Sequence, residues 1–401
     1  MNRIFLIGNG FDLAHGLKTS YSDFIKWCFD YEKNLAQAKK EVDRFDLEFH
    51  PTQNNQYDYT VQLERSILHL KHSRSDHGRR NSNYFRMNCE LTPFTNELKD
   101  YNKQIYSEVK FNNKLLGKLI LLFKQREKKT VNWVDIEYFY YQELNYGSNI
   151  EELDKDFDEV KNLLKEYLNT LPSPANVSPI VKGIFNKDVI SNEINQQRLS
   201  DVQHMHPYIN SLYDLSLEGD GNLYEFPPVK NFFITFNYTD TLSLYDIDNV
   251  IPIHGTLNDN IIFGFGDEEA EKFREIRNNE NPLYQKNIKT YDYLERDDYY
   301  EIEKIINSRL YQVVILGHSC GSADKTFLKT LFEHKNCISI KPHYFKNEIS
   351  NTDNYRDILI GISRCLENDA SNMRSNVVDK TKTEPFSILK KKDEVFELTE
   401  S

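Results

Sequence analysis

The chain has 401 residues, of which 39% are hydrophobic, 13% are aromatic and 28% are charged. A chain of this length fills one or two domains of about 100–200 residues, and its apolar content excludes global disorder. The formal net charge is −12, whereas a protein that binds nucleic acid or an anionic membrane over much of its surface needs a basic face. The composition therefore argues against nucleic acid as a partner.

The cysteines and the N-terminus narrow the class further. The five cysteines are odd in number and form no C-x-x-C pair, so they indicate neither a disulfide framework nor a structural zinc site. The apolar run over residues 4–7 is too short for a secretory signal, and no later run could span a bilayer. The sequence predicts a soluble cytoplasmic protein with no metal and no membrane contact.

The first 30 residues have the pattern of half a βαβ unit. A strand over residues 3–7 is followed by the glycine turn Gly8-Asn9-Gly10. Ser20 and Asp23 have the spacing of a capping box, and the apolar residues around and after them recur at helical intervals. A strand, a glycine-rich turn and a helix in this order begin a βαβ unit.

Residues 31–225 lose the strand pattern and gain a helical one. Residues 150–168 place apolar side chains on one helical face, and Pro172 and Pro174 end that helix. A second helix, rich in aromatic residues, begins at Trp133. We interpret 31–225 as a large, mostly helical insertion.

Strand patterns return after residue 225. Short apolar runs, typical of parallel strands covered on both faces, occupy residues 231–235, 250–253, 261–265, 312–316 and 337–340. An acidic helical block separates the third run from the fourth. The sequence predicts an α/β fold with a mainly parallel, Rossmann-like sheet built from residues 1–30 and 226–345. The helical insertion interrupts this sheet, the strand over residues 4–7 lies inside it, and a polar extension, 346–401, follows it.

The glycine turn is the first motif that could carry chemistry. Gly8, Asn9 and Gly10 would let backbone N–H groups approach a phosphate at the start of a helix. Leu13 stands where the dinucleotide fingerprint has its third glycine. A tight turn without a ligand is the alternative.

The second motif follows the strand over residues 231–235. Polar side chains past the carboxyl end of a parallel strand point into the crevice where ligands bind, which applies to Thr235, Asn237 and Asp240. The alternative is a helix N-cap formed by Asn237 or Thr239.

His254 follows the next strand candidate. An imidazole, whose pKa lies near neutrality, is a natural general base in a crevice, and a structural histidine is the alternative. The histidine groups at 69–77 and 204–206 have no carboxylate or cysteine at metal-ligand spacing, so we expect surface or structural roles there.

Gly317-His318-Ser319-Cys320-Gly321 has the form of a G-x-S-x-G nucleophile elbow on a strand, turn and helix. The acid and histidine of such a triad lie further along the chain, after intervening strands, whereas Asp324, His334 and His343 follow the serine closely. We therefore interpret Ser319 as a turn residue that faces a ribose or a phosphate. Neither histidine should reach its hydroxyl.

The order of these motifs resembles that of AbiH-type bacteriophage abortive infection proteins, a bacterial phage-defence family. The N-terminal signature is L-I-G-N-G-F-D-L-A-H-G-L-K-T-S-Y, at residues 6–21. The later motifs follow in the family's order: W-V-D-I-E from 133, F-N-Y-T from 236, H-G from 254, F-G-F-G-D from 263 and L-G-H-S-C-G-S-A-D from 316. The resemblance implies a phage-defence effector.

The chain is also similar, more distantly, to the sirtuin-like NAD-binding fold. In that fold a glycine turn holds the diphosphate, a T-x-N motif lines the nicotinamide-ribose pocket, an H-G histidine acts as base, and a late G-x-S turn contacts the adenine-side ribose. The matching residues here are Gly8, Gly10, Thr235, Asn237, His254, Gly317 and Ser319. The sirtuin acid two places after the asparagine is replaced by Thr239, and the zinc-binding cysteines are missing, so we do not expect a protein deacetylase.

The resemblances imply NAD, or a related nucleotide, as substrate or ligand. We expect three catalytic residues: Asn237, His254 and Asp240. We expect further residues to hold the nucleotide: Gly8, Asn9, Gly10, Asp12, Thr235, Gly317, Ser319 and Asp324. Asp12 or Asp240 would stabilise positive charge on the ribose, a choice that the resemblance leaves open.

Three function hypotheses follow. The first is a defence effector that cleaves the nicotinamide–ribose bond of NAD. The second is a catalytically silent nucleotide sensor or scaffold in a defence complex, and the third is a serine hydrolase that uses Ser319. A homo-oligomer or a partner from the same defence system is compatible with each.

Overall fold

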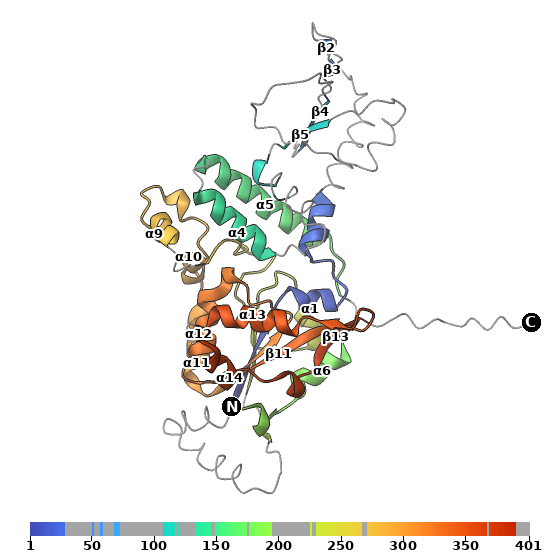
Figure 1. Cartoon of the computed structure of the whole chain (residues 1–401), viewed down its shortest axis with the longest axis vertical. Coiled ribbons are helices and arrows are strands. Elements are labelled where there is room, and N and C mark those ends of the chain that lie inside the picture. The colour runs from blue at the N-terminus through green and yellow to red at the C-terminus, as the bar shows by residue number, and fades with distance from the viewer. Residues whose placement is uncertain are drawn as a thin grey trace, which may run out of the picture. The chain divides into compact units, whose positions relative to one another are not determined.

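The computed structural model describes residues 1–28, 113–116, 119, 133–145, 149–174, 176–194, 230–266, 271–366 and 369–389 (Figure 1). It also describes five short strand segments, at 50–51, 57–58, 68–72, 107–111 and 225–226. The chain divides into two compact units. The first contains residues 1–20, 133–146 and 168–401, and the second contains residues 21–132 and 147–167.

The first unit is built on a mainly parallel sheet. In spatial order its strands are β9 (Val250–Pro252), β8 (Asn231–Thr235), β1 (Asn2–Ile7), β10 (Tyr311–Leu316) and β11 (Cys337–Asn347). All four pairings between these neighbours are parallel. β11 also pairs in parallel with β13 (Pro385–Leu389) and antiparallel with β12 (Thr352–Asp353). The prediction of a mainly parallel sheet with the N-terminal strand inside it is confirmed.

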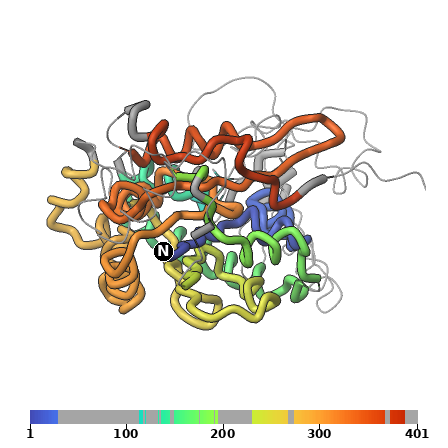
Figure 2. Tube along the Cα trace, turned by 90° about the horizontal axis from the view of Figure 1, so that it is seen from below, coloured from blue at the N-terminus to red at the C-terminus, as the bar shows by residue number. Residues whose placement is uncertain are grey.

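The chain order places a switch point between β1 and β10. From β1 the sheet grows through β8 and β9 in one direction, and β10 then returns to the other side of β1. Figure 2 shows this arrangement, with the blue N-terminal strand between the yellow segment of β8 and β9 and the orange segment of β10 and β11. A crevice forms outside the carboxyl ends of the strands at such a point, because the connections on its two sides run in opposite directions.

The central strand is buried along its whole length because each face meets a helical layer. Ile4 and Leu6 pack into one core cluster and Phe5 and Ile7 into another. Side chains alternate across a strand, so a continuous apolar run supplies both faces at once.

Helices with one apolar stripe cover these two faces. α11 (Asp298–Ser308), α12 (Lys325–Glu333) and α13 (Tyr355–Cys365) contribute buried residues to the cluster with Ile4 and Leu6. α1 (Asn9–Ala14) and α6 (Pro179–Asn186) contribute to the cluster with Phe5 and Ile7. Figure 1 shows α11 to α14 together, with α6 beside β13.

The first unit contains further α-helices, 3-10 helices and one further pair of strands. The α-helices are α4 (Trp133–Asn145), α9 (Glu271–Arg277), α10 (Lys289–Leu294) and α14 (Asp369–Asn376). The 3-10 helices are η1 (Ser191–Glu193), η2 (Thr241–Tyr245), η3 (Pro282–Tyr284), η4 (Ser322–Asp324) and η5 (Lys380–Lys382). β6 (Val189–Ile190) and β7 (Glu225–Phe226) form an antiparallel pair.

A buried arginine ties α6 to the sheet. Arg3, 2% exposed, donates to the carbonyls of Ile184 and Lys187 at 3.0 and 2.6 Å. The last carbonyls of a helix have no partner within it, so the guanidinium satisfies the end of α6. This contact explains why residues 168–194 belong to the first unit.

The predicted boundaries differ from the compact units. Residues 133–146 and 168–194 fall in the first unit, although the sequence assigned them to the insertion. The predicted polar extension after residue 345 contributes β12, α13, α14 and β13 to the same unit. Phe386, 3% exposed, packs into the core cluster with Phe5, which is why this segment is ordered against the sheet.

One strand prediction is wrong. Residues 261–265 form no strand, and Phe265 makes only an isolated bridge to Ile288. Gly264 lies so close to the backbone of Asn287 that a Cβ would not fit, so this segment follows the contour of a neighbouring loop.

The second unit is organised around α5 (Ile150–Thr170), of which residues 150–167 belong to it. Its buried face includes Phe157, Val160 and Leu164, as the helical spacing predicted. Residues 21–28 are also helical, and Phe24 lies 5.8 Å from Tyr167 between ring centroids.

This unit also contains two antiparallel strand pairs, which the sequence did not predict. They are β2 (His50–Pro51) with β3 (Tyr57–Asp58), and β4 (Leu68–His72) with β5 (Ser107–Phe111). The rest of the predicted insertion, including the histidines at 77, 204 and 206, lies outside the described residues. Among the described helices, none combines the length and hydropathy that a membrane span requires.

Candidate functional site

The glycine turns after β1 and β10 pack backbone against backbone. Gly8 N donates to Leu316 O at 3.1 Å, and Gly10 N donates to Gly317 O at 2.9 Å. A Cβ on Gly8 would lie 2.5 Å from the Cα of His318, and Gly317 has a φ of +75°. The glycines are therefore required by the contact between the two turns. The amides of Gly8 and Gly10, which we expected to hold a diphosphate, already have acceptors.

A polar cluster joins the end of β8 to the start of α1. Asp12 is 2% exposed and accepts a hydrogen bond from the hydroxyl of Thr239. Asn237 donates from Nδ2 to Gly8 O at 3.1 Å, and its backbone N–H donates to Thr235 Oγ1 at 3.1 Å. Burial raises the pKa of Asp12 against the opposing effect of these donors. Asn237 and Thr239 thus connect the end of β8 to the segment that follows β1. Neither occupies the N-cap position of η2, which is Asp240.

A second, charged cluster lies beyond the carboxyl ends of β9 and β10. Lys289, the first residue of α10, places Nζ 2.8 Å from Glu137 Oε1 and 2.9 Å from Asp324 Oδ1. Glu137 comes from α4, and its Oε1 also accepts from the backbone N–H of Gly264 at 3.3 Å. Lys289 is 1% exposed, Glu137 4% and Asp324 7%. One buried lysine therefore pairs with two buried carboxylates.

Two histidines direct N–H groups at Asp324. Cys320 N donates to His318 Nδ1 at 3.1 Å, which leaves the ring proton of neutral His318 on Nε2, 3.5 Å from Asp324 Oδ2. His254 Nε2 lies 3.1 Å from Asp324 Oδ1 and 3.1 Å from the hydroxyl of Tyr293. An ionised carboxylate only accepts, so His254 carries its proton on Nε2. Nδ1 is then its basic nitrogen.

The two carboxylates of the cluster titrate in different ranges. Burial raises the pKa of Glu137 to about 7, partly opposed by the charge of Lys289. Burial also acts to raise the pKa of Asp324, but Lys289 and His254 outweigh it and hold that pKa well below the ordinary value. Carboxyl groups whose environments separate their pKa values are typical of sites that move protons.

His254 is neutral at physiological pH. Burial and the nearby charge of Lys289 lower its pKa to about 4. The ring is therefore in the unprotonated form that a general base needs at pH 7, and Asp324 fixes its orientation.

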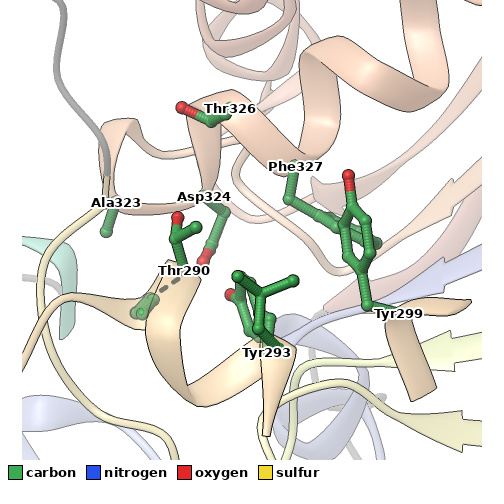
Figure 3. Close-up of a pocket in the computed structure, with 10 residues that line it drawn as sticks. Thr290, Tyr293, Tyr299, Ala323, Asp324, Thr326 and Phe327 are labelled. Atoms are coloured by element: carbon green, nitrogen blue, oxygen red, sulfur yellow. Dashed lines mark hydrogen bonds and ion pairs between the residues drawn. The ribbon is translucent and has the colours of Figure 1, made fainter. Parts of the chain in front are cut away.

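A cavity of about 160 Å³ opens beside Lys289 and Asp324. Its other lining residues come from α10, the start of α11 and the η4–α12 segment: Thr290, Tyr293, Leu294, Tyr299, Ala323, Thr326 and Phe327, with Gly266. Figure 3 shows Asp324 and Thr290 on one side of this cavity and Tyr299 and Phe327 on the other.

The predicted site residues thus fall into separate groups. His254 and Asp324 meet in the charged cluster. Asp12, Thr235 and Asn237 meet in the polar cluster with Gly8. Asp240 is exposed and belongs to neither.

Among the described residues, Ser319 has none of the partners of a triad serine. It is exposed, whereas His334 Nε2 bonds to Asn307 Oδ1 at 3.3 Å and His343 Nδ1 to Glu384 O at 2.9 Å. Neither histidine orients toward the serine hydroxyl, so the geometry gives a hydrolase no general base there.

Four members of the charged cluster were not predicted as site residues: Glu137, Lys289, Tyr293 and His318, of which His318 lies inside the predicted turn at 317–321. Glu137 closes the W-V-D-I-E motif, so the motif itself was the available signal. Lys289 and Tyr293 lie in a polar stretch that resembles any exposed helix, and no local pattern marks them.

Fold and site together define an α/β protein whose mainly parallel sheet carries a buried ionised cluster beyond the carboxyl ends of its strands. A family model described as "Bacteriophage abortive infection AbiH" matches residues 4–345, and the chain belongs to this family. Its role is therefore defence against bacteriophage by abortive infection. The matched range includes both glycine turns and every residue of the charged cluster. Searches of curated proteins and of solved structures found no match.

Proposed function

We propose that this protein is a defence effector that binds NAD or a related nucleotide and cleaves its nicotinamide–ribose bond. The observation that carries the proposal is the hydrogen bond between His254 and Asp324 beyond the carboxyl ends of β9 and β10. Nε2 of the histidine lies 3.1 Å from Oδ1 of the aspartate. The strand order β9-β8-β1-β10-β11-β13 supports it, because it is the 3-2-1-4-5-6 order of dinucleotide-binding Rossmann sheets.

Hydrolysis of the nicotinamide–ribose bond needs a general base for the attacking water, whereas the leaving nicotinamide needs no general acid. Water adds to the ribose carbon as the carbon–nitrogen bond breaks, and the bonding pair leaves with the nicotinamide nitrogen, which loses its positive charge. The attacking water releases a proton, which His254 accepts on Nδ1 before it passes to solvent. Asp324 holds the ring through Nε2–H and keeps Nδ1 available.

The developing positive charge on the ribose needs a nearby negative group. Asp12 and Asn237 remain our candidates for contacting the ribose, since both are buried at the end of β8 and beside the turn after β1. The amides of Gly8 and Gly10 are already hydrogen-bonded and have no part in this proposal.

The test compares infected cells that express the wild-type chain or the double variant Asn237→Ala, His254→Ala. We expect wild-type cells to lose NAD and release nicotinamide after infection, and the double variant to retain NAD and lose protection. His334→Ala is the matched control, because His334 bonds to Asn307 outside the site. Normal protection and NAD loss in a folded double variant would contradict the proposal.

A nucleotide sensor without turnover gives a different result in the same assay. It protects the cells while NAD stays constant and no nicotinamide appears. The serine hydrolase is not proposed, because neither His334 nor His343, the histidines that follow Ser319 in the described chain, pairs with its hydroxyl.

A further inference from the structure

The cavity beside Lys289 and Asp324 has no part in the proton transfer described above. Its volume is about 160 Å³, close to that of an apolar protein cavity of about 150 Å³ that binds benzene. It suits one flat ring with a small substituent and is too small for a whole dinucleotide, since pockets for drug-sized ligands already measure about 300–1,000 Å³.

Aromatic side chains form one wall of this cavity. The rings of Tyr293 and Tyr299 are nearly parallel, with an interplanar angle of 10° and centroids 6.5 Å apart. Phe327 lies 6.1 Å from Tyr293 and 6.2 Å from Tyr299 between centroids. Such a wall favours a flat aromatic ligand, because aromatic rings gain from offset or edge contacts with one another.

Lys289 and Asp324, which also line the cavity, offer a donor next to an acceptor, and Figure 3 shows Asp324 across from Phe327 and Tyr299. A carboxylate accepts about four hydrogen bonds, and Asp324 receives three, from Lys289, His254 and His318. A lysine ammonium has three donors, and Lys289 directs two of them at Glu137 and Asp324. One acceptor position therefore remains on the carboxylate of Asp324 and one donor on the ammonium of Lys289. Nζ of the lysine lies only 2.9 Å from Oδ1 of the aspartate.

We propose that this cavity binds the heteroaromatic end of the nucleotide. A ring that carries an acceptor beside an N–H donor complements the pair, with its acceptor toward Lys289 and its N–H toward Asp324. The carboxamide of nicotinamide and the amino edge of adenine both have this arrangement. The inference rests on the proposed function, and it adds which part of the nucleotide the cavity takes.

The experiment measures binding of free rings to the full-length protein by saturation-transfer NMR. Nicotinamide and adenine are the probes, and benzoate is the control ring, because its carboxylate would face the carboxylate of Asp324. We expect nicotinamide or adenine to bind at least tenfold more tightly than benzoate. Nicotinamide mononucleotide and ADP-ribose then show which end of the dinucleotide supplies the ring.

Two adjacent tyrosines provide matched variants. Tyr299 lines the cavity, whereas Tyr300 is 59% exposed on the same helix. Tyr299→Ala should weaken ring binding at least tenfold, and Tyr300→Ala should leave it unchanged. Thr326→Phe, at an exposed position that lines the cavity, adds a ring there without removing a core residue and should also abolish binding if Tyr299→Ala fails to fold.

The outcomes separate this inference from the proposed function. Absence of ring binding, equal binding of benzoate, or wild-type binding by Tyr299→Ala and Thr326→Phe would overturn the cavity assignment even where NAD is cleaved. Ring binding without NAD loss in infected cells would retain the cavity and overturn the cleavage.

Discussion

At the residue scale, the charge of Lys289 acts on both carboxylates of the charged cluster and lowers the pKa of each. Moving an ammonium and two carboxylates out of water is costly, and the mutual attraction of the groups offsets this only when the geometry is close. The Nζ distances of 2.8 and 2.9 Å satisfy that condition for both Glu137 and Asp324. One cation cannot neutralise two carboxylates, so Glu137 is the partner that takes up a proton near neutral pH.

Glu137→Gln tests this division through the pH dependence of stability. The folded pKa of Glu137 is about 7 and its ordinary value is 4.5, so the folded state binds the proton more tightly. Its contribution is complete below pH 4.5 and is lost as pH rises through 7. The unfolding free energy of the wild type minus that of Glu137→Gln should fall by about 2–3 kcal/mol between pH 5 and pH 8.

Urea unfolding at the two pH values measures this difference. Glu303→Gln, at an exposed position of α11, is the control and should show no such change. A difference between wild type and Glu137→Gln that does not vary with pH would mean that Glu137 is ionised throughout the range.

At the scale of elements, the glycine turns act as a structural joint between β1 and β10. Gly8→Ala should destabilise the fold by more than about 2 kcal/mol, because the new Cβ would lie 2.5 Å from a backbone atom of the facing turn. Gly183→Ala is the matched control. Gly183 lies inside α6, where a Cβ would meet no neighbouring atom within 4 Å, and alanine there should stabilise the helix by up to about 1 kcal/mol.

Thermal unfolding of the two variants measures these effects. Equal melting temperatures for Gly8→Ala and the wild type would show that the turns can separate. The amides of these glycines would then be free to approach a phosphate, as the glycine turn predicts from its sequence.

Predictability from the sequence also differs between elements. β1, β8 and β10 could be predicted, because strands buried on both faces are continuous apolar runs. Residues 261–265 have a similar composition, yet they form no strand and instead pack against the backbone around Asn287, a contact with a segment distant in sequence that no local pattern records. His254 and Asp324 carry motif signals. The burial of Lys289, in contrast, depends on side chains from α4 and the η4–α12 turn, which no local pattern records.

At the scale of the whole molecule, both ends of the described chain close the same core. Phe5 of β1 and Phe386 of β13 belong to one core cluster, together with Phe185 of α6. Rings of Phe5 and Phe185 meet edge to face with centroids 5.2 Å apart. The first unit is therefore complete only when its C-terminal strand has joined, although the family match ends at residue 345.

Phe386→Ala tests whether this late strand is part of the cooperative fold. Phe386 is 3% exposed, and truncation of a buried phenylalanine costs about 3–5 kcal/mol through lost burial and the cavity left behind. Ile360→Ala on α13 is the control, since Ile360 is 43% exposed and its truncation should cost much less. Denaturant unfolding followed by tryptophan fluorescence, with Trp133 in the first unit, should show one transition shifted to lower denaturant. An unshifted transition for Phe386→Ala would mean that the C-terminal strand packs on a core already complete without it.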